Sequence, residues 1–258
     1  MLRPADDRRI LDQNGFLVLT DFLSGEWLAR LRCRVEELFV EEGEAAGSEF
    51  KKEPGCRRLA NLVDKGDEFR AMIIHRPILE YVRYVLGPDI KLSSLNARSV
   101  NPGGGAQPLH ADMAAVADMK GYWVCNTIWM LDDYTADNGA LRLIPGSHRR
   151  GKLPHDALAD PLAEHPEQTL VMGRAGTVVV MNAHLWHAGT INTTARSRTS
   201  LHAFYCRRDK PQQQYQKQLL RPEVQESLSR ELRDLLALDD PLNDKLSAEV
   251  AVRSGFLK

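Results

Sequence analysis

The sequence predicts a mainly β protein with flanking helices, whose core is a double-stranded β-helix of the jelly-roll, cupin-like type. Three observations favour this class: the strand-like segments of residues 90–206 are short, clusters of glycine and proline separate them, and they do not alternate regularly with helices. We expect one domain over residues 1–258. Its β core would occupy about 90–206, with a strand and helices before it in 1–88 and a helical tail after it in 212–258.

The N-terminal third predicts a strand followed by helices. Gly15–Thr20 is a short apolar, β-rich run, and Ser24 offers an N-cap to a helix whose apolar side chains recur at helical spacing over residues 27–39. Residues 41–66 are polar and rich in glycine and proline, which predicts a long irregular segment of the kind that often forms a lid. Residues 69–86 have helical spacing again, interrupted by one proline and ended by a Gly-Pro pair.

The predicted core strands are apolar or β-branched runs bounded by turn residues. They are Ile90–Val100, a segment around His110, Tyr122–Leu131, Ala140–Ile144, Thr177–Met181, a segment near His187, and Thr199–Cys206. In the tail, Pro222 marks where a helix begins, and leucine and valine recur at helical spacing from Val224 to Leu236. We expect this helix to pack outside the barrel or against a second subunit, which would make the protein a homodimer.

Composition indicates a globular protein with a small-molecule partner. Lysine plus arginine (34) nearly balances aspartate plus glutamate (35), so no overall positive field would attract nucleic acid or an anionic membrane. No stretch approaches the roughly 20 apolar residues of a membrane helix, and the charged N-terminus lacks the apolar region of a signal peptide. The four cysteines are scattered without a C-x-x-C pair, which fits reduced thiols and a cytoplasmic protein.

His110-Ala111-Asp112 is the first candidate site motif. Side chains two positions apart in a strand lie on the same face, so a strand here would present an imidazole and a carboxylate together. Such a pair supplies two ligands of the two-His, one-carboxylate triad, which leaves the other positions on iron(II) open. The tripeptide alone is a weak signal, and more often belongs to a polar strand edge or a surface turn.

Two later segments contain side chains that would complete such a site. His184 and His187 follow a buried-looking strand, and on spacing alone either could be the third metal ligand. Arg196 and Arg198 lie two apart at the start of the next strand, hence on one face. A planar guanidinium binds a carboxylate in bidentate fashion, so either arginine suits the far end of a dicarboxylate.

The stretch from Gln107 to Arg198 resembles the phytanoyl-CoA dioxygenase family of iron(II)- and 2-oxoglutarate-dependent oxygenases. The resemblance covers the middle third to half of the chain, and it rests on an ordered set of motifs rather than on one tripeptide. In order they are Gln107-Pro108-Leu109-His110-Ala111-Asp112, Trp129-Met130-Leu131-Asp132-Asp133, Asn138-Gly139-Ala140-Leu141, Ile144-Pro145-Gly146-Ser147-His148, and His187-Ala188-Gly189-Thr190-Ile191-Asn192 continuing to Arg198.

The resemblance implies the roles of the site residues. The metal ligands would be His110, Asp112 and His187 rather than His184, because the family places its 2-oxoglutarate arginine where Arg198 lies relative to His187. Iron(II) would be the metal, with 2-oxoglutarate and O2 as cosubstrates. Two further cosubstrate contacts are expected, at Gln107 and Thr127, and the turn histidine His148 would not be a ligand.

One departure from the family pattern concerns the cosubstrate. Many relatives have a serine two residues after the distal histidine, whereas this chain has Gly189. Thr190 or Ser200 would have to replace its hydroxyl group. Asp112 favours an oxygenase over the related halogenases, in which a small residue replaces this carboxylate.

The expected reaction is hydroxylation of a C–H bond in a small-molecule metabolite, with release of succinate and CO2. Desaturation, ring formation and epimerisation use the same chemistry, so the sequence supports only the class. Lys51, Lys52, Arg57 and Arg58 could meet an anionic substrate such as an acyl-CoA, although a solvated run of charges is the simpler interpretation. Two rival functions are a zinc-dependent hydrolase or lyase with the same ligands, and a non-enzymatic jelly-roll binding module.

Overall fold

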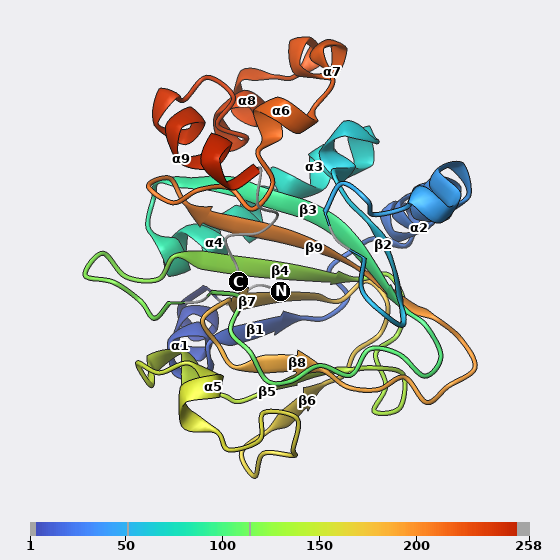
Figure 1. The fold of residues 1–258 in the computed structure, drawn as a ribbon, viewed down its shortest axis with the longest axis vertical. Helices are drawn as coiled ribbons and strands as arrows, with labels where there is room; N and C mark the ends of the chain where they lie inside the picture. Colours follow the sequence, from blue (N-terminus) through green and yellow to red (C-terminus); the bar gives the residue numbers. More distant parts are fainter. Residues whose placement is uncertain (1–3, 51, 114, 252–258) are drawn as a thin grey trace.

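Two antiparallel sheets form the core of the computed structural model, which describes residues 4–50, 52–113 and 115–251 (Figure 1). The larger sheet has the strand order β1-β7-β4-β9-β3-β2 and the smaller has the order β6-β5-β8. The strands are β1 (Phe16–Leu19), β2 (Cys56–Leu59), β3 (Ile90–Val100), β4 (Val124–Met130), β5 (Leu141–Leu143), β6 (Thr169–Val171), β7 (Val178–Asn182), β8 (His187–Gly189) and β9 (Arg198–Arg207). This arrangement confirms the predicted double-stranded β-helix with flanking helices.

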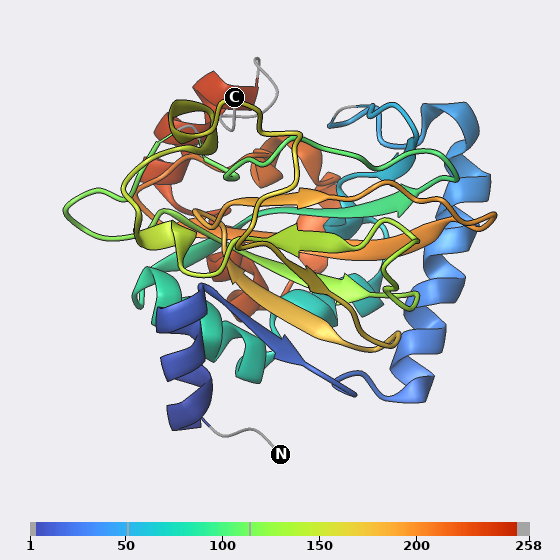
Figure 2. The same cartoon turned by 90° about the horizontal axis from the view of Figure 1, so that it is seen from below.

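Most helices lie at the ends of the larger sheet and on its outer face; they are α1 (Pro4–Asn14), α2 (Gly25–Glu42), α3 (Asp67–Ile73), α4 (Arg76–Leu86), α6 (Gln216–Leu219), α7 (Pro222–Ser227), α8 (Arg230–Leu235) and α9 (Pro241–Ala251). The short helix α5 (Pro154–Ala157) lies beside the smaller sheet (Figure 1). Short 3-10 turns cover Gly43–Ala45, Leu62–Asp64 and Ser147–Arg149. Helix α4 packs against β4, β7 and β9, while α1 and α2 lie at opposite ends of the sheets (Figures 1 and 2).

Strand β4 shows how the larger sheet separates the core from the site. Cys125 and Trp129 belong to the large apolar cluster under the helices, whereas Asn126 and Ile128 line a cavity between the two sheets. This alternation follows from the period of two in a strand. One face of the sheet therefore provides stability, and the other face positions polar groups.

Several local predictions are confirmed. The Ser24 hydroxyl accepts a hydrogen bond from the Trp27 amide and caps α2, as expected. The helical region before the core is indeed interrupted, because α3 ends at Ile73 and α4 restarts with Pro77 in its first turn. Gly87 then ends α4 with a φ of 88°, a conformation that glycine adopts without strain.

Other local predictions are wrong. Residues 41–66 are not wholly irregular, because β2 within them pairs with β3. His110 does not lie in a strand: it forms one isolated bridge with His187, and Asp112 follows in a bend. The single tail helix is two helices, α7 and α8, because Leu228 is extended and the Ser229 side chain caps a new helix. The structure also adds α1 and β6, which the sequence patterns did not indicate.

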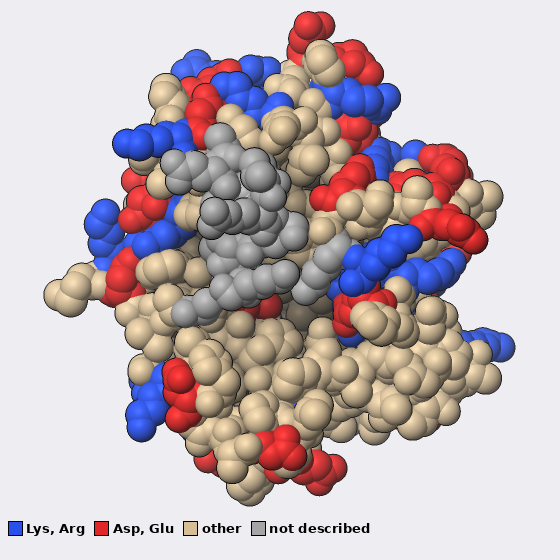
Figure 3. Space-filling view, viewed as in Figure 1, with Lys and Arg blue, Asp and Glu red and all other residues tan. Residues whose placement is uncertain are grey.

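The tail covers the sheet of its own chain, which is the first of the two alternatives expected for it. The apolar side chains that predicted a tail helix are buried within this chain; they are Val224, Leu228, Leu232, Leu235 and Leu236. On the face of Figure 3, both signs of charge are interspersed over the C-terminal helices and α2. No helix within the described residues combines the length and apolarity needed to cross a bilayer.

Buried hydrogen bonds join α9 to β3. The Asn243 side chain is fully buried; its oxygen accepts from Lys91 Nζ at 2.8 Å and from the Ser247 hydroxyl at 2.7 Å, and its nitrogen donates to Gln212 at 3.0 Å. Burial lowers the pKa of Lys91, so this ammonium depends on such oxygen partners.

We therefore predict that Asn243→Ala lowers the free energy of unfolding by about 1–3 kcal/mol, because it leaves buried polar groups unpaired. Leu242→Ala is the matched control on the same helix, since that side chain is 49% exposed. Urea denaturation measures both variants. Equal stability of Asn243→Ala and the control would show that the buried network does not hold the tail.

Candidate metal centre

Backbone pairing brings three predicted ligands together from distant parts of the chain. The His110 amide donates to the His187 carbonyl at 2.9 Å, and the His187 amide donates back to the His110 carbonyl at 2.9 Å. The Asp112 amide donates to the Ala183 carbonyl, also at 2.9 Å. The segment of residues 110–112 is thus held against residues 183–187.

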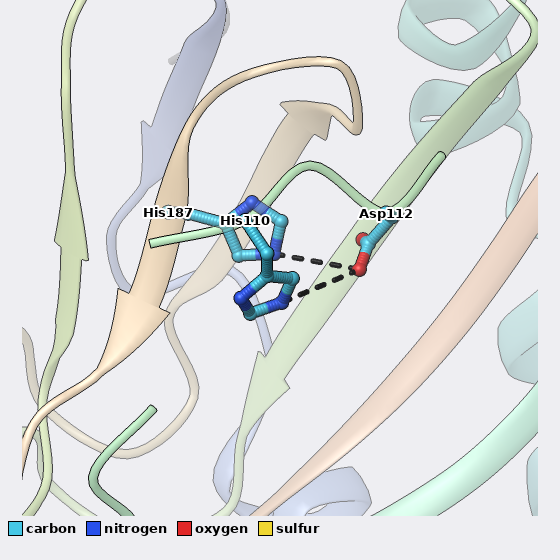
Figure 4. A group of neighbouring side chains, drawn as sticks. All are labelled: His110, Asp112 and His187. Carbon is cyan, nitrogen blue, oxygen red and sulfur yellow. Dashed lines mark ion pairs between the residues drawn. The ribbon is translucent and has the colours of Figure 1, made fainter. Parts of the chain in front are cut away.

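The side chains of these residues converge on one small space (Figure 4). The Nε2 atoms of His110 and His187 lie 3.8 and 3.5 Å from the same oxygen of Asp112, and all three potential ligand atoms are within 4.8 Å of one another. Each Nδ1 faces a backbone carbonyl, that of Pro108 at 2.9 Å and that of Leu185 at 2.8 Å. These carbonyls favour a proton on Nδ1 and direct the Nε2 lone pairs into the shared space, as metal-binding histidines require.

The electrostatics of the cluster also suit a cation. Burial raises the pKa of Asp112, but His187, His110 and the Asn126 amide outweigh this effect and lower the pKa to about 2. Burial lowers the pKa of His187, yet the Asp112 carboxylate and the Leu185 carbonyl leave it above its usual value. The carboxylate is therefore ionised at neutral pH, and two imidazoles and one carboxylate fit a divalent metal with open positions.

His184, the alternative third ligand, lies outside this cluster. Its Nε2 accepts a hydrogen bond from the Trp123 amide at 2.9 Å, and burial lowers its pKa to about 4. The turn histidine His148 is also buried elsewhere, with its ring 5.6 Å from that of Tyr122. The structure thus selects His187 over His184 as the companion of His110 and Asp112.

Arg198 lines the same cavity, which has a volume of about 210 Å³. The residue is 3% exposed, and its guanidinium donates to the Tyr134 hydroxyl at 2.6 Å, to the Ser200 hydroxyl at 3.3 Å and to the Gly139 carbonyl. These partners are all neutral oxygens, and burial lowers the pKa of Arg198. A buried cation with neutral partners favours an anionic ligand. The neighbouring Arg196 is exposed.

Comparison with known proteins places the chain in a family. Residues 11–200 match the model of the phytanoyl-CoA dioxygenase (PhyH) family. The chain belongs to this family. Dioxygenase af480 of Aspergillus fumigatus is 31% identical to it over 191 residues, which is 72% of this chain and 60% of that relative.

Solved structures related to this PhyH-family chain share its fold. AviO1 from Streptomyces viridochromogenes superposes with a TM-score of 0.64 at 25% identity, covering 81% of this chain and 96% of AviO1. EctD from S. alaskensis, solved with 2-oxoglutarate and 5-hydroxyectoine, superposes with a TM-score of 0.67 at 20% identity, covering 80% of this chain and 76% of EctD. These likenesses confirm the cupin-like jelly roll.

Gln107 occupies the place next to Gly189, where many PhyH proteins have a serine. Its side-chain oxygen accepts from the Gly189 amide at 3.0 Å. A Cβ atom at position 189 would lie 2.6 Å from the Gly105 carbonyl oxygen and 3.3 Å from the Gln107 oxygen, so a serine does not fit here. Of the two expected replacements, Thr190 bonds to the Ala140 carbonyl, whereas the Ser200 hydroxyl lies beside Arg198.

The structure does not bring Thr127 into the cavity. Its hydroxyl donates to the Ala203 carbonyl at 3.2 Å and accepts from the Trp129 indole at 2.9 Å. Asn126 and Ile128, the residues on either side, face the cavity instead. No sequence pattern indicated this orientation, because both faces of β4 are buried.

Glu53 forms an ion-pair cluster at the cavity wall that sequence reasoning missed. Its carboxylate accepts from Arg98 at 2.6 and 3.0 Å, from Gln107 at 3.1 Å and from Arg58. The basic residues expected within 51–58 therefore do not form one patch: of them, Arg58 belongs to the Glu53 cluster. Lys52 bonds to the Glu44 carbonyl and Arg57 lies over the Phe39 ring, while Lys51 is outside the described residues.

The pKa of Glu53 predicts a pH effect on stability. Burial raises this pKa, but Arg98 and Arg58 outweigh burial and lower it from 4.5 to about 2. A lowered folded-state pKa stabilises the protein above the unfolded value, and this stabilisation is lost as the pH falls toward the folded value. This lowering of the pKa corresponds to a contribution of about 3 kcal/mol to the free energy of unfolding.

We predict that Glu53→Gln is less stable than the wild type at neutral pH, and that the difference in unfolding free energy shrinks by about 3 kcal/mol between pH 5 and pH 2. Chemical denaturation at several pH values measures both proteins. A difference that stays constant with pH would contradict this account of the Glu53 cluster.

Proposed function

We propose that this chain is an iron(II)- and 2-oxoglutarate-dependent dioxygenase that hydroxylates a C–H bond of a small-molecule metabolite. The observation that carries the proposal is the convergence of His110, Asp112 and His187 on a cavity that also contains the buried Arg198. Family membership and relatives named as dioxygenases, including ectoine dioxygenase of Bordetella bronchiseptica, support it.

Each residue has a role that follows from its position. His110, Asp112 and His187 would hold the iron, which when bound supplies the oxygen chemistry driven by oxidative decarboxylation of 2-oxoglutarate to succinate. Arg198 would bind the far carboxylate of 2-oxoglutarate, and Tyr134 and Gly139 fix the orientation of its guanidinium. Gln107, which lines the cavity and accepts from the Gly189 amide, would contact the bound 2-oxoglutarate.

Three arginines give this side of the cavity a positive charge, and burial and these charges keep the nearby histidine, His202, neutral. His202 lines the cavity from β9, the strand that contains Arg198, and β9 pairs with β3, which contains Arg98. Burial and the nearby charges of Arg58, Arg98 and Arg198 lower its pKa to about 3. It is therefore uncharged at neutral pH, and its Nε2 lies 3.1 Å from the Ser200 hydroxyl. The dicarboxylate would be attracted by guanidinium groups alone.

The two rival functions make different use of the same residues. A zinc-dependent hydrolase or lyase needs the three ligands but has no evident use for a buried guanidinium beside them. A non-enzymatic binding module needs neither the three metal ligands nor the guanidinium. Iron-dependent succinate formation supports the oxygenase, and activity retained with zinc alone supports the first rival.

We further propose that residues 1–258 act as one oxygenase domain in the cytoplasm. Hydrogen bonds between the tail and β3 support a single unit: Lys91 of β3 donates to Asn243, and Gln212 of the tail donates to the Leu92 carbonyl of β3. A homodimer through the C-terminal helices stays a prediction of the sequence. Light scattering of the purified protein measures its mass and tests this prediction.

Removing the carboxylate ligand tests the metal assignment. We predict that Asp112→Ala lowers iron-dependent succinate formation by about 100-fold or more, because it removes one of the three side chains that would bind the metal. Loss of a residue that only hydrogen-bonds to a metal ligand already lowers metal affinity or activity by about 10–100-fold. Asp156→Ala is the control, since that side chain is 59% exposed. Succinate formation by Asp112→Ala at the wild-type rate would refute the assignment.

Arg198→Met tests the cosubstrate assignment. We expect the dissociation constant for 2-oxoglutarate to rise by about 30-fold or more, because truncating one partner of a buried charge pair costs about 2–5 kcal/mol. The matched control is Arg196→Met, two residues away and exposed. Calorimetric titration with 2-oxoglutarate gives both values, and equal affinities of the two variants would exclude Arg198 as the carboxylate ligand.

A further inference from the structure

The end of the cavity farthest from Arg198 is lined by uncharged polar side chains. The cavity-lining residues of β3 and β9 pair in rows, Asn96 with His202 and Ser94 with Phe204, and the lining residue Arg98 pairs with Ser200. Arg198 lies at the start of β9, so the row of Ser94 and Phe204 is about 20 Å farther along the strand. The two ends of the cavity therefore offer different chemistry.

The segment after β9 closes this uncharged end. The Gln213 amide nitrogen of the backbone donates to the Ser93 hydroxyl at 2.6 Å, and its side-chain oxygen accepts from the Ser94 hydroxyl at 2.5 Å. Gln212 anchors the same segment through bonds to the Leu92 and Leu236 carbonyls. The Gln213 side chain lines the cavity, and its NH2 group has no hydrogen-bond partner within the part of the chain that the structure describes.

Two asparagines at this end also have unused hydrogen-bonding groups. Asn96 is 4% exposed and lines the cavity, yet its side-chain oxygen has no partner among the described residues. Asn126 donates to the Asp112 carboxylate at 3.4 Å, which fixes its amide orientation and leaves its oxygen unpaired. Buried polar groups are nearly always satisfied, so these oxygens require hydrogen-bond donors from a ligand or from water.

Apart from Asp112, the charged residues that line the cavity belong to other rows of the sheet. Its charged lining residues are Arg58 and Arg98, which share Glu53, together with Arg198 and Asp112. Among the described lining residues, the group of Ser94, Asn96, Phe204 and Gln213 includes no charge. Asn126 connects this group to the candidate metal centre, so a molecule bound here would lie next to Asp112.

We propose that Ser94, Asn96, Asn126 and Gln213 form the binding subsite for the primary substrate, and that this substrate is a neutral molecule with hydroxyl or amide groups. An apolar ring or chain of the same molecule packs on Phe204, which is the large apolar side chain of this wall. The proposal rests on the proposed function, because it treats the molecule as what the dioxygenase acts on. It assigns no phosphate-bearing group, such as that of an acyl-CoA, to this end of the cavity.

Ligand-detected NMR with chemically matched probes tests the subsite directly. The probes are cyclohexane-1,2-diol, cyclohexanecarboxamide, cyclohexanecarboxylate and cyclohexylammonium, which share one ring and differ in charge. The protein is loaded with zinc(II) and 2-oxoglutarate so that no turnover occurs. We expect saturation transfer to the diol and the carboxamide, at least five times stronger than to either charged probe. Equal or stronger transfer to a charged probe would overturn the proposal.

Two variants locate the binding. Asn96→Leu and Gln213→Met remove hydrogen-bonding groups at nearly constant volume, and Gln218→Met, at an exposed position of α6, is the matched control. We expect the saturation transfer to the neutral probes to be at least five times weaker in each cavity variant than in the wild type, and unchanged in the control. Signals unchanged in both cavity variants would place the neutral probes elsewhere and refute the subsite.

Calorimetric titration of the same samples with 2-oxoglutarate separates this proposal from the proposed function. Normal 2-oxoglutarate binding without discrimination among the probes would refute the subsite and leave the dioxygenase standing. Absent 2-oxoglutarate binding, combined with neutral-probe binding that depends on Asn96 and Gln213, would support the subsite and refute the dioxygenase. Normal 2-oxoglutarate affinity in Asn96→Leu and Gln213→Met also shows that both variants are folded.

Discussion

The reciprocal backbone hydrogen bonds between His110 and His187 are the constraint on which the site depends. Each bond is 2.9 Å long, and together they fix two imidazoles that come from distant segments of the chain. The Asp112 amide is tied in the same way to the Ala183 carbonyl. Main-chain hydrogen bonds fix the backbone from which all three side chains extend. This restricts the positions of the ligand atoms, as a preorganised metal site requires.

Charge arrangement provides the second level of organisation. Asp112 is the acidic member of the candidate metal centre, and Glu53 neutralises part of the Arg58 and Arg98 pair. Arg198 has only neutral oxygens as partners and is therefore the guanidinium most available to an anion. The opposite end of the cavity has amides and a hydroxyl instead. One cavity between two sheets can thus accept a dicarboxylate at one end and a neutral molecule at the other.

The fold class was predictable because it depends on local signals, whereas the three converging residues were predicted from an ordered set of motifs that resembles a family. Short strands separated by glycine and proline indicated the jelly roll, and ordered motifs indicated the site. One argument reached the correct pairing for the wrong reason: His110 and Asp112 do not share a strand face, since Asp112 lies in a bend. Their proximity comes from pairing with residues 183–187, which no local pattern of residues 110–112 encodes.

The remaining errors have physical causes of the same kind. Thr127 could not be oriented, because apolar residues occupy both faces of a strand buried on both sides. Glu53 lies in a polar segment without periodicity, where only the fold places it against Arg98. Gln212 and Asn243 were not singled out in the sequence, because glutamine and asparagine are mostly exposed, yet both are buried in a tertiary hydrogen-bond network.

The most direct test of the central claim is an anaerobic titration of the protein with iron(II) and 2-oxoglutarate, followed by visible absorption. If His110, Asp112 and His187 hold iron beside Arg198, the chelate of iron and 2-oxoglutarate gives a charge-transfer band that saturates at about one equivalent per chain. Absence of the band, while the protein stays folded and iron is in excess, would contradict the account.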